Sequence, residues 1–347
     1  MAVTLKDIAS KVGVSPTTVS LVLNQGSDSR IGEATQQKIL ETAQELGYQT
    51  SRTPQAAQPS ALPVHPTIGL VISDIRNPFF TELSSVIEDV ASRFGYNIIL
   101  CNTREDRDIE HEFLEVLWRR HVHGLILAPA DCEHSDLRDF LKHEIPVVLV
   151  DRYIEGTKTH AVLVDNVAGA YRATEYLIKL GHRRIGIIAG RDRITTVRER
   201  LQGYLNALRD YEIPCDETLI ARSDLYTVEG GHQALAELLQ CRPFPSAIFS
   251  SAGVSTIGAL LELQQRGIRI PDELSFIGFD DENWGRLINP PLTVVSQPVH
   301  EIAQEATQLM IQMIQGWSRK EFRRIVLHTD LIIRQSCRKY SETAAKT

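Results

Sequence analysis

The sequence predicts a multidomain protein with a small helical head followed by two α/β halves. Three observations support this. Apolar residues in the first fifty positions recur with helical spacing, residues 49–66 are rich in proline without any aromatic residue, and from Thr67 short β-rich apolar runs alternate with segments of helical period. Because 347 residues exceed what a single hydrophobic core usually serves, we expect two or three domains.

The first two predicted helices flank a glycine-containing turn. Leu5, Ile8, Ala9 and Val12 fall on one helical face, and Gly13 is expected to end that helix. A second helix should start at Ser15 and Pro16, because a serine hydroxyl caps free amides and proline loses no hydrogen bond at the first helical position. Its inward residues would be Val19, Val22 and Leu23, and its outward residues Thr17, Thr18, Ser20 and Asn24. This arrangement is typical of a helix-turn-helix that binds the DNA major groove, although a plain helical hairpin is the alternative.

A third helix over Thr35–Leu46 is expected to close the core of the head. Its inward side carries Ile39, Leu40, Ala43 and Leu46, and Gly47 follows. Residues 1–62 hold five basic and five acidic side chains, so this head is not basic. Its affinity for phosphates must therefore also rest on helix N-termini and hydroxyl groups.

The body should contain parallel sheets covered by helices on both faces. In the first half, strands are expected over 67–73, 96–101, 123–128 and 146–150, with helices over Phe80–Phe94 and Ile109–Arg120. In the second half, strands are expected over 161–165, 183–190, 246–250 and 274–280, with helices over Ala168–Leu180, Arg198–Tyr211, Glu229–Leu239 and Val254–Gln265.

Ligands of such sheets bind beyond the carboxyl ends of the strands. The residues at those positions are Asn77 to Phe80, Asp151 and Arg152, Thr195 to Arg200, Asp280 and Asp281, and Gln297. Aromatic faces, carboxylates and guanidinium groups together suit a polyol or a nucleobase.

Several classes of protein are disfavoured. No dinucleotide-binding G-x-G-x-x-G follows a strand, and no P-loop, G-x-S-x-G or H-E-x-x-H motif occurs, so we expect neither an enzyme nor a bound cofactor or metal. The five cysteines are scattered without a C-x-x-C pair, which favours free thiols. Without a signal peptide or a long apolar run, a cytoplasmic protein with no membrane partner is expected, rather than a periplasmic solute-binding protein.

Longer strings narrow the prediction. VTLKDIASKVGVSPTTVSLVLN, IRNPFF, GHRRIGIIAG, RERLQGY, IPDELSFIGFDD and NPPLTVVSQP occur in this order over nearly the whole chain. In these motifs the sequence resembles the lac repressor family of bacterial transcriptional regulators. The resemblance implies a helix-turn-helix head, a hinge, and a body like that of periplasmic sugar-binding proteins.

The resemblance also implies the residues that contact DNA. Base-contacting positions fall on Pro16 and Thr17, and a position that is often arginine in relatives falls on Leu21. The operator should therefore depend less on guanine at the Leu21 contact. Phosphate-contacting positions fall on Thr18, Ser20, Asn24 and Thr35, and the implied DNA-binding set also includes Thr4, Ser15, Tyr48 and Ala57. Ala57 replaces the hinge leucine that wedges into the minor groove, and Pro54 lies within the would-be hinge helix, so weaker bending of the operator is expected.

The effector contacts implied by position are Phe79, Phe80, Asp151, Arg152, Thr196, Arg200, Tyr226, Asp280 and Gln297. Other roles stay open, because Asp280 could cap a turn, Arg152 could pair with a carboxylate, and either Phe could lie in the core. The chain has Ala252 and Gly253 where many sugar-responsive relatives carry a polar pair. Ser250, Ser251 or Ser255 could substitute, or the effector could be smaller or less hydroxylated than a hexose.

The expected organisation is a DNA-binding domain over 1–49, a hinge over 50–66, an effector-binding and dimerisation domain over 67–337, and a tail over 338–347. Within the body, we expect one subdomain over about 67–160 plus 292–322 and another over about 161–291 plus 323–337. The expected function is a repressor that binds a pseudo-palindromic operator as a homodimer and responds to a sugar-like or nucleobase-like small molecule. The terminal SETAAKT lacks leucine heptads, which favours a dimer over a tetramer.

Overall fold

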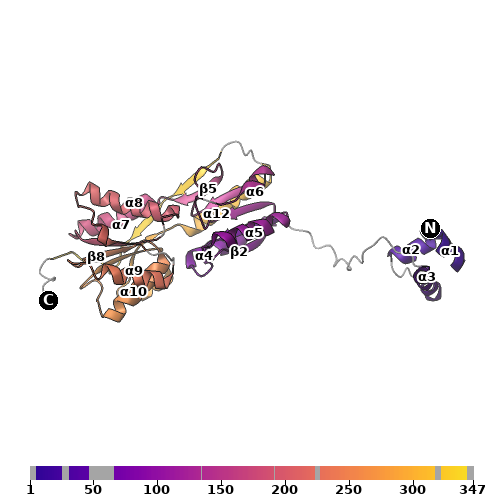
Figure 1. Cartoon of the computed structure of the whole chain (residues 1–347), viewed down its shortest axis with the longest axis horizontal. Coiled ribbons are helices and arrows are strands. Elements are labelled where there is room, and N and C mark those ends of the chain that lie inside the picture. Colours follow the sequence, from indigo (N-terminus) through magenta and orange to yellow (C-terminus); the bar gives the residue numbers. More distant parts are fainter. Residues whose placement is uncertain are drawn as a thin grey trace. The chain divides into compact units, whose positions relative to one another are not determined.

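A computed structural model describes residues 5–25, 31–46, 66–133, 135–190, 192–222, 227–316 and 322–341. The chain divides into two compact units, Met1–Val64 and His65–Thr347 (Figure 1). The predicted fold class is confirmed: helices form the first unit, and two six-stranded sheets with flanking helices form the second. The predicted hinge over 50–66 lies outside the described residues except for Pro66. Among the described residues, no helix is both long and apolar enough to cross a membrane.

The first unit contains three short helices, α1 (Leu5–Val12), α2 (Pro16–Gln25) and α3 (Glu33–Glu45). The first turn follows the predicted chemistry, since Gly13 has a left-handed φ of 78° and the Ser15 Oγ accepts the Thr18 amide at 3.1 Å. The buried residues are Ile8, Ala9, Val19, Val22, Thr42, Ala43 and Ile39.

One inward residue was predicted wrongly. Leu40 is 52% exposed, whereas Thr42 is buried. Ile39, Ala43 and the partly buried Leu46 already fill the stripe of α3 that faces α1 and α2, and Leu40 is rotated about 100° away from Ile39.

In the second unit, each half contains one six-stranded sheet, and the two sheets have equivalent strand orders. The strand order is β11-β5-β4-β3-β1-β2 in the first sheet and β12-β10-β9-β8-β6-β7 in the second. All strands of the first sheet pair in parallel, and in the second only β12 is antiparallel to its neighbour. The strands are β1 Thr67–Ile72, β2 Asn97–Asn102, β3 Gly124–Leu127, β4 Val147–Val150, β5 His160–Val164, β6 Ile185–Ala189, β7 Ile220–Arg222, β8 Ala247–Ser250, β9 Ser275–Phe279, β10 Thr293–Ser296, β11 Arg324–Leu327 and β12 Asp330–Ile332.

Helices cover both faces of each sheet. In Figure 1, α7 and α8 lie on one side of β8, and α9 and α10 lie on the other. The helices of the body are α4 Pro78–Arg93, α5 Arg107–Arg119, α6 Arg138–Lys142, α7 Asn166–Lys179, α8 Thr195–Asp210, α9 Val228–Leu238, α10 Gly253–Arg266, α11 Asn283–Leu287 and α12 Val299–Ile314. The short elements α6, β7 and α11 were not predicted, because three to five residues carry too little periodicity.

The subdomain assignment needs three corrections. Strands β5 and β11, predicted for the second half, pair in the first sheet, and β10, predicted for the first half, pairs in the second. The physical reason is the internal repeat, since β10 beside β9 occupies the position that β5 occupies beside β4. Strand β12 lies in the second sheet, as predicted. Helix α12 does return to the first half as predicted, where it packs on α4 and β4.

Within the described residues the chain therefore crosses between the halves three times. The crossings lie at Asp165, at Gln297–Pro298 and at His328–Thr329. Two of them are tied together, because the Asp165 Oδ1 accepts from the Thr329 amide at 3.0 Å and from its hydroxyl at 2.7 Å.

Candidate functional site

Two aspartates end equivalent strands of the two halves. Asp151 follows β4 with a φ of 63°, and Asp280 follows β9 with a φ of 74°. Each donates its amide to the neighbouring strand, Asp151 to the Val162 carbonyl at 3.2 Å and Asp280 to the Val295 carbonyl at 2.8 Å. Aspartate tolerates this left-handed backbone better than bulky residues do, so the same turn presents a carboxylate from each sheet.

Arg200 lies beside the ends of β8 and β9. From α8, its Nε donates to the Asn166 Oδ1 and its Nη1 to the Ser251 carbonyl, both at 2.8 Å. The guanidinium carbon lies 3.6 Å from the centre of the Phe279 ring, a close cation–π contact. Burial raises the pKa of the Asp151 carboxyl, with Asp280 and Glu105 acting in the same direction, while Arg152 and Arg200 oppose the rise.

Arg152 is held by protein groups. Its Nη1 and Nη2 donate to the two carboxylate oxygens of Glu105 at 2.7 and 2.8 Å, and Nη1 also donates to the Pro129 carbonyl. This bidentate pair is buried on the arginine side and fixes the loop that follows β2. The alternative role for Arg152 as the partner of a carboxylate is therefore observed, and its predicted contact with a ligand stays a prediction.

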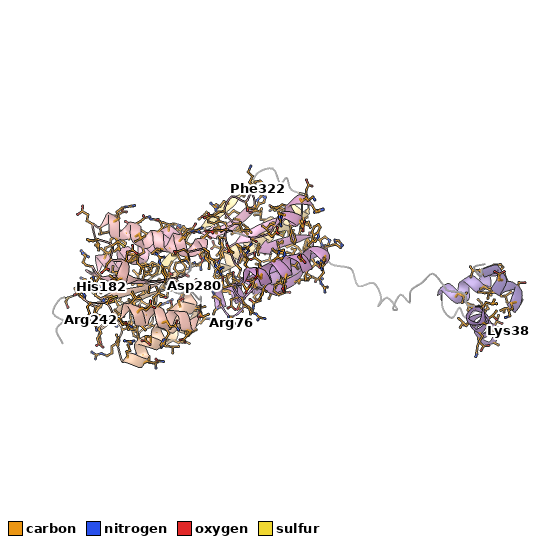
Figure 2. All side chains as sticks on the ribbon, viewed as in Figure 1. Lys38, Arg76, His182, Arg242, Asp280 and Phe322 are labelled. Carbon is orange, nitrogen blue, oxygen red and sulfur yellow. The ribbon has the colours of Figure 1, made fainter. Side chains whose placement is uncertain are left out.

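Asp280 belongs to a small polar group. The Gln297 Nε2 donates to its Oδ1 at 2.6 Å, and the Gly253 amide at the start of α10 donates to its Oδ2 at 3.2 Å. Asp280 lies near the junction of the two halves (Figure 2). Asp280 and Gln297 line a cavity of about 440 Å³ together with Phe79 and Glu82 from α4, so this cavity lies between elements of both halves.

The remaining predicted effector positions divide between the cavity and the core. Phe79 lines the cavity although it is largely buried, and its ring meets that of Phe80 edge to face at 5.1 Å. Phe80 is 2% exposed and packs in the core of the first half, which was the alternative to a ligand contact. Thr196 is buried in the first turn of α8, and Tyr226 lies outside the described residues.

A second set of contacts joins the halves near the start of α8. The Arg198 guanidinium pairs with Glu133 at 3.4 Å and also with Glu155, and both carboxylates come from the first half. Beside them, the Cys132 amide donates to the Arg193 carbonyl at 3.4 Å, and the Thr195 amide donates to the Cys132 Sγ at 3.4 Å. These contacts hold the two halves together beside the strand ends.

Three polar residues near the site were missed from the sequence. Glu105 holds Arg152, Asn166 orients Arg200, and Glu282 lines the cavity. Glu282 directly follows the Asp-Asp pair after a predicted strand, so its place in the sequence could have indicated a site residue. Two of the three serines suggested as substitutes donate to main-chain carbonyls instead, Ser251 to Ile188 at 2.8 Å and Ser250 to Ala252 at 3.5 Å, and Ser255 is buried at the start of α10.

The predicted DNA-binding positions fall largely on α2. The Ser15 and Thr18 hydroxyls lie 2.8 Å apart at its start, beside the exposed Pro16, and Thr35 is half-buried at the start of α3. The backbone of α2 also carries Thr17, Ser20, Leu21 and Asn24. Thr4, Tyr48 and Ala57 lie outside the described residues.

Both the helical head and the α/β body match known protein families. Residues 4–51 match the model of bacterial regulatory proteins of the lacI family, and residues 65–335 match that of periplasmic binding proteins and the sugar-binding domain of the LacI family. The chain belongs to the LacI family. As a LacI-family protein, it is a DNA-binding regulator of transcription with a body of the sugar-binding type.

Individual LacI-family relatives match over nearly the full length. The transcriptional regulator DegA of Bacillus subtilis is 34% identical over 97% of this chain and 98% of its own, and the transcriptional repressor CytR of Escherichia coli K12 is 33% identical over 97% of both. A LacI-family regulator from Enterococcus faecium, solved with bound ribose, superposes with a TM-score of 0.72 at 30% identity, covering 79% of this chain and 100% of that one. All three of these relatives are named as transcriptional regulators or repressors, and none is named as an enzyme.

Proposed function

We propose that this protein is a repressor that binds a pseudo-palindromic operator as a homodimer and is controlled by a small molecule between the two halves of its body. The observation that carries the proposal is that Asp151 and Asp280 end equivalent strands of the two sheets, and that Asp280 lines a cavity together with residues of both halves. A ligand that bridges them binds a closed arrangement of the halves better than an open one, and only such differential binding shifts a conformational equilibrium.

The chemistry of the cleft supports a ligand with several hydrogen-bonding groups. Carboxylates accept from hydroxyl or amino groups, Arg200 donates in a planar fork, and Phe79 offers an apolar face. Among the described residues, the Arg200 Nη2 has no hydrogen-bond partner, so it is available to a ligand. The ribose-bound relative supports a sugar or a sugar-containing metabolite as the ligand class.

The head supports recognition of a half-site. One helix-turn-helix reads only a few base pairs, so two copies related by a twofold axis suit an inverted repeat. With balanced charges among its first 62 residues, a single head should bind DNA weakly, and specific affinity should require both heads. Pro16, Thr17 and Leu21 are the proposed base contacts, and Thr18, Ser20, Asn24 and Thr35 the proposed phosphate contacts.

The proposal is tested by titrating the full-length protein against operator fragments. An inverted repeat recovered from genomic fragments should bind far more tightly than its single half-site, and one compound from a panel of sugars and nucleobases should change that affinity about five- to hundredfold. Equal binding to the half-site and the full site would contradict the homodimer. An affinity that no compound changes would contradict control through the cleft.

A further inference from the structure

A second carboxylate lies beside Asp280 in the cavity between the halves. Glu282 lines this cavity, and its Oε2 accepts from the Trp284 indole, whereas its buried Oε1 has no partner among the described residues. A Cβ added to Gly253 would lie 2.7 Å from that Oε1 and 3.1 Å from the Asp280 Oδ2. The absence of a side chain at Gly253 therefore leaves room for Glu282.

Neither carboxylate has a cationic partner among the described residues. Asp280 accepts only from the Gln297 amide group and the Gly253 main chain, and Glu282 only from an indole. Burial raises the pKa of Glu282, and the nearby charge of Asp280 raises it further. Two adjacent, partly desolvated carboxylates are costly to keep charged without a cation.

The other carboxylates of the cavity differ from this pair. Asp281 binds Arg334 at 2.7 Å and Arg286 at 2.8 Å, and Glu82 lies 3.3 Å from the His300 Nε2. Glu301 is exposed in the first turn of α12, where water solvates its charge. The need for a positive charge is thus confined to Asp280 and Glu282.

Gln297 supplies an independent indication that a donor is missing. This side chain is only 9% exposed and lines the same cavity. Its Nε2 is fixed on Asp280, and the opposite atom, Oε1, is buried without a partner among the described residues. A buried carbonyl oxygen without a donor is unfavourable, so a ligand that donates to it gains affinity.

We propose that the effector carries a primary ammonium group, and that Asp280, Glu282 and Gln297 bind this group. The inference rests on the proposed function, because it concerns the same cleft. An ammonium group offers three N–H donors to three acceptors and offsets one of the two negative charges of the carboxylate pair, whereas a hydroxyl offers one donor and no charge. Amino sugars combine such a group with hydroxyl groups, which suit other polar side chains that line the cavity, such as Asn283 and Ser296.

The test compares matched pairs of neutral and amino sugars on the full-length protein. D-glucose with D-glucosamine, D-galactose with D-galactosamine and D-mannose with D-mannosamine are ranked by thermal shift and then by calorimetry. At least one amino sugar should bind about tenfold or more tightly than its neutral counterpart, since truncating one partner of a buried charge pair costs this much or more. Equal or tighter binding of the neutral sugars, or no binding of any amino sugar, overturns the proposal.

Two variants assign the preference to Glu282. Glu282→Gln keeps the shape and the indole contact, so it should remain folded and lose most of the preference for the amino sugar, whereas Glu82→Gln in the same cavity should keep it. Gly253→Ala pushes a methyl group against Glu282 and should lower the preference independently. An unchanged preference in folded Glu282→Gln contradicts the proposal.

The failure of this inference and the failure of the proposed function can be told apart. Operator release by a neutral sugar alone contradicts this inference and leaves the proposed function intact, whereas a failure to bind any operator contradicts the proposed function.

Discussion

At the scale of the residue, Arg152 and Arg200 show two uses of a buried guanidinium. Arg152 donates to the Glu105 carboxylate and the Pro129 carbonyl. Arg200 lies against the Phe279 ring and donates to Asn166 and to the Ser251 carbonyl. The sequence predicted both positions because each lies at or near the end of a strand. It could not separate their roles, because Glu105 reaches Arg152 through a loop whose residues Arg104 and Glu105 both have positive φ.

Removing the charge of Glu105 should destabilise the body. Glu105→Gln removes the bidentate carboxylate partner of the buried Arg152 and leaves it only the Asp151 carboxylate, 3.3 Å from its Nε, which should lower the free energy of unfolding by about 3 kcal/mol. Urea denaturation of the full chain measures the change, with the exposed Glu112→Gln on α5 as the control. A loss as small as that of the control would show that the ion pair contributes little.

Asp281 should make stability depend on pH in the acid range. Burial alone would raise its pKa, but hydrogen bonds from Arg286 and Arg334 lower it below the ordinary 3.8. A carboxyl with a lowered pKa in the folded state stabilises the fold above its unfolded pKa, and this stabilisation is lost as pH falls toward the folded value. Thermal unfolding of Asp281→Asn should therefore differ most from the parent above about pH 4 and converge with it on acidification. The exposed Asp272→Asn serves as control, and a gap that persists at low pH contradicts the assignment.

At the scale of the element, the internal repeat explains which predictions succeeded. Strands such as β1, β4 and β9 were predicted because they are buried apolar runs between helices. The sheet that contains β5 or β10 could not be read from such runs, because pairing depends on a neighbour distant in sequence. Recognising that β10 repeats β5 would have corrected both assignments.

Close helix packing depends on Gly258. A Cβ at this position on α10 would lie 1.8 Å from the Val228 carbonyl oxygen of α9, so Gly258→Ala must push the two helices apart. We expect a loss of about 2 kcal/mol or more in unfolding free energy, measured by urea denaturation. Gly285→Ala on α11 is the matched control, because its Cβ would meet only Leu292 at 3.7 Å. Equal stability of both variants would contradict the packing described here.

The contacts at the start of α8 should control opening of the two halves. Arg198→Ala removes half-exposed ion pairs with Glu133 and Glu155, so global stability should fall by less than about 1 kcal/mol. Amide hydrogen exchange should nevertheless accelerate at Cys132 and Thr195, whose amides bond across the halves. Arg209→Ala, which removes a pair with the adjacent Asp210, should leave exchange there unchanged. Unaltered exchange in Arg198→Ala would show that these ion pairs do not restrain opening.

At the scale of the whole molecule, the sequence predicted the head and the α/β body, because helical periodicity and the alternation of strands and helices are local signals. The candidate cleft was predicted only as a set of strand ends. Its internal bonds, such as Asn166 to Arg200 between α7 and α8 and Gln297 to Asp280 beyond β10 and β9, join residues that are distant in sequence and become neighbours only when the second half folds.

The most direct test of the central claim is operator binding of the full-length protein with and without cleft ligands. Genomic fragments captured by the protein are sequenced, and the recovered site is titrated in the presence of sugars, amino sugars and nucleobases. We predict one enriched inverted repeat and one compound that shifts its affinity about five- to hundredfold, with the shift lost in Arg200→Lys. Enrichment of no site, or an affinity that stays constant under a compound that stabilises the body, would contradict the account.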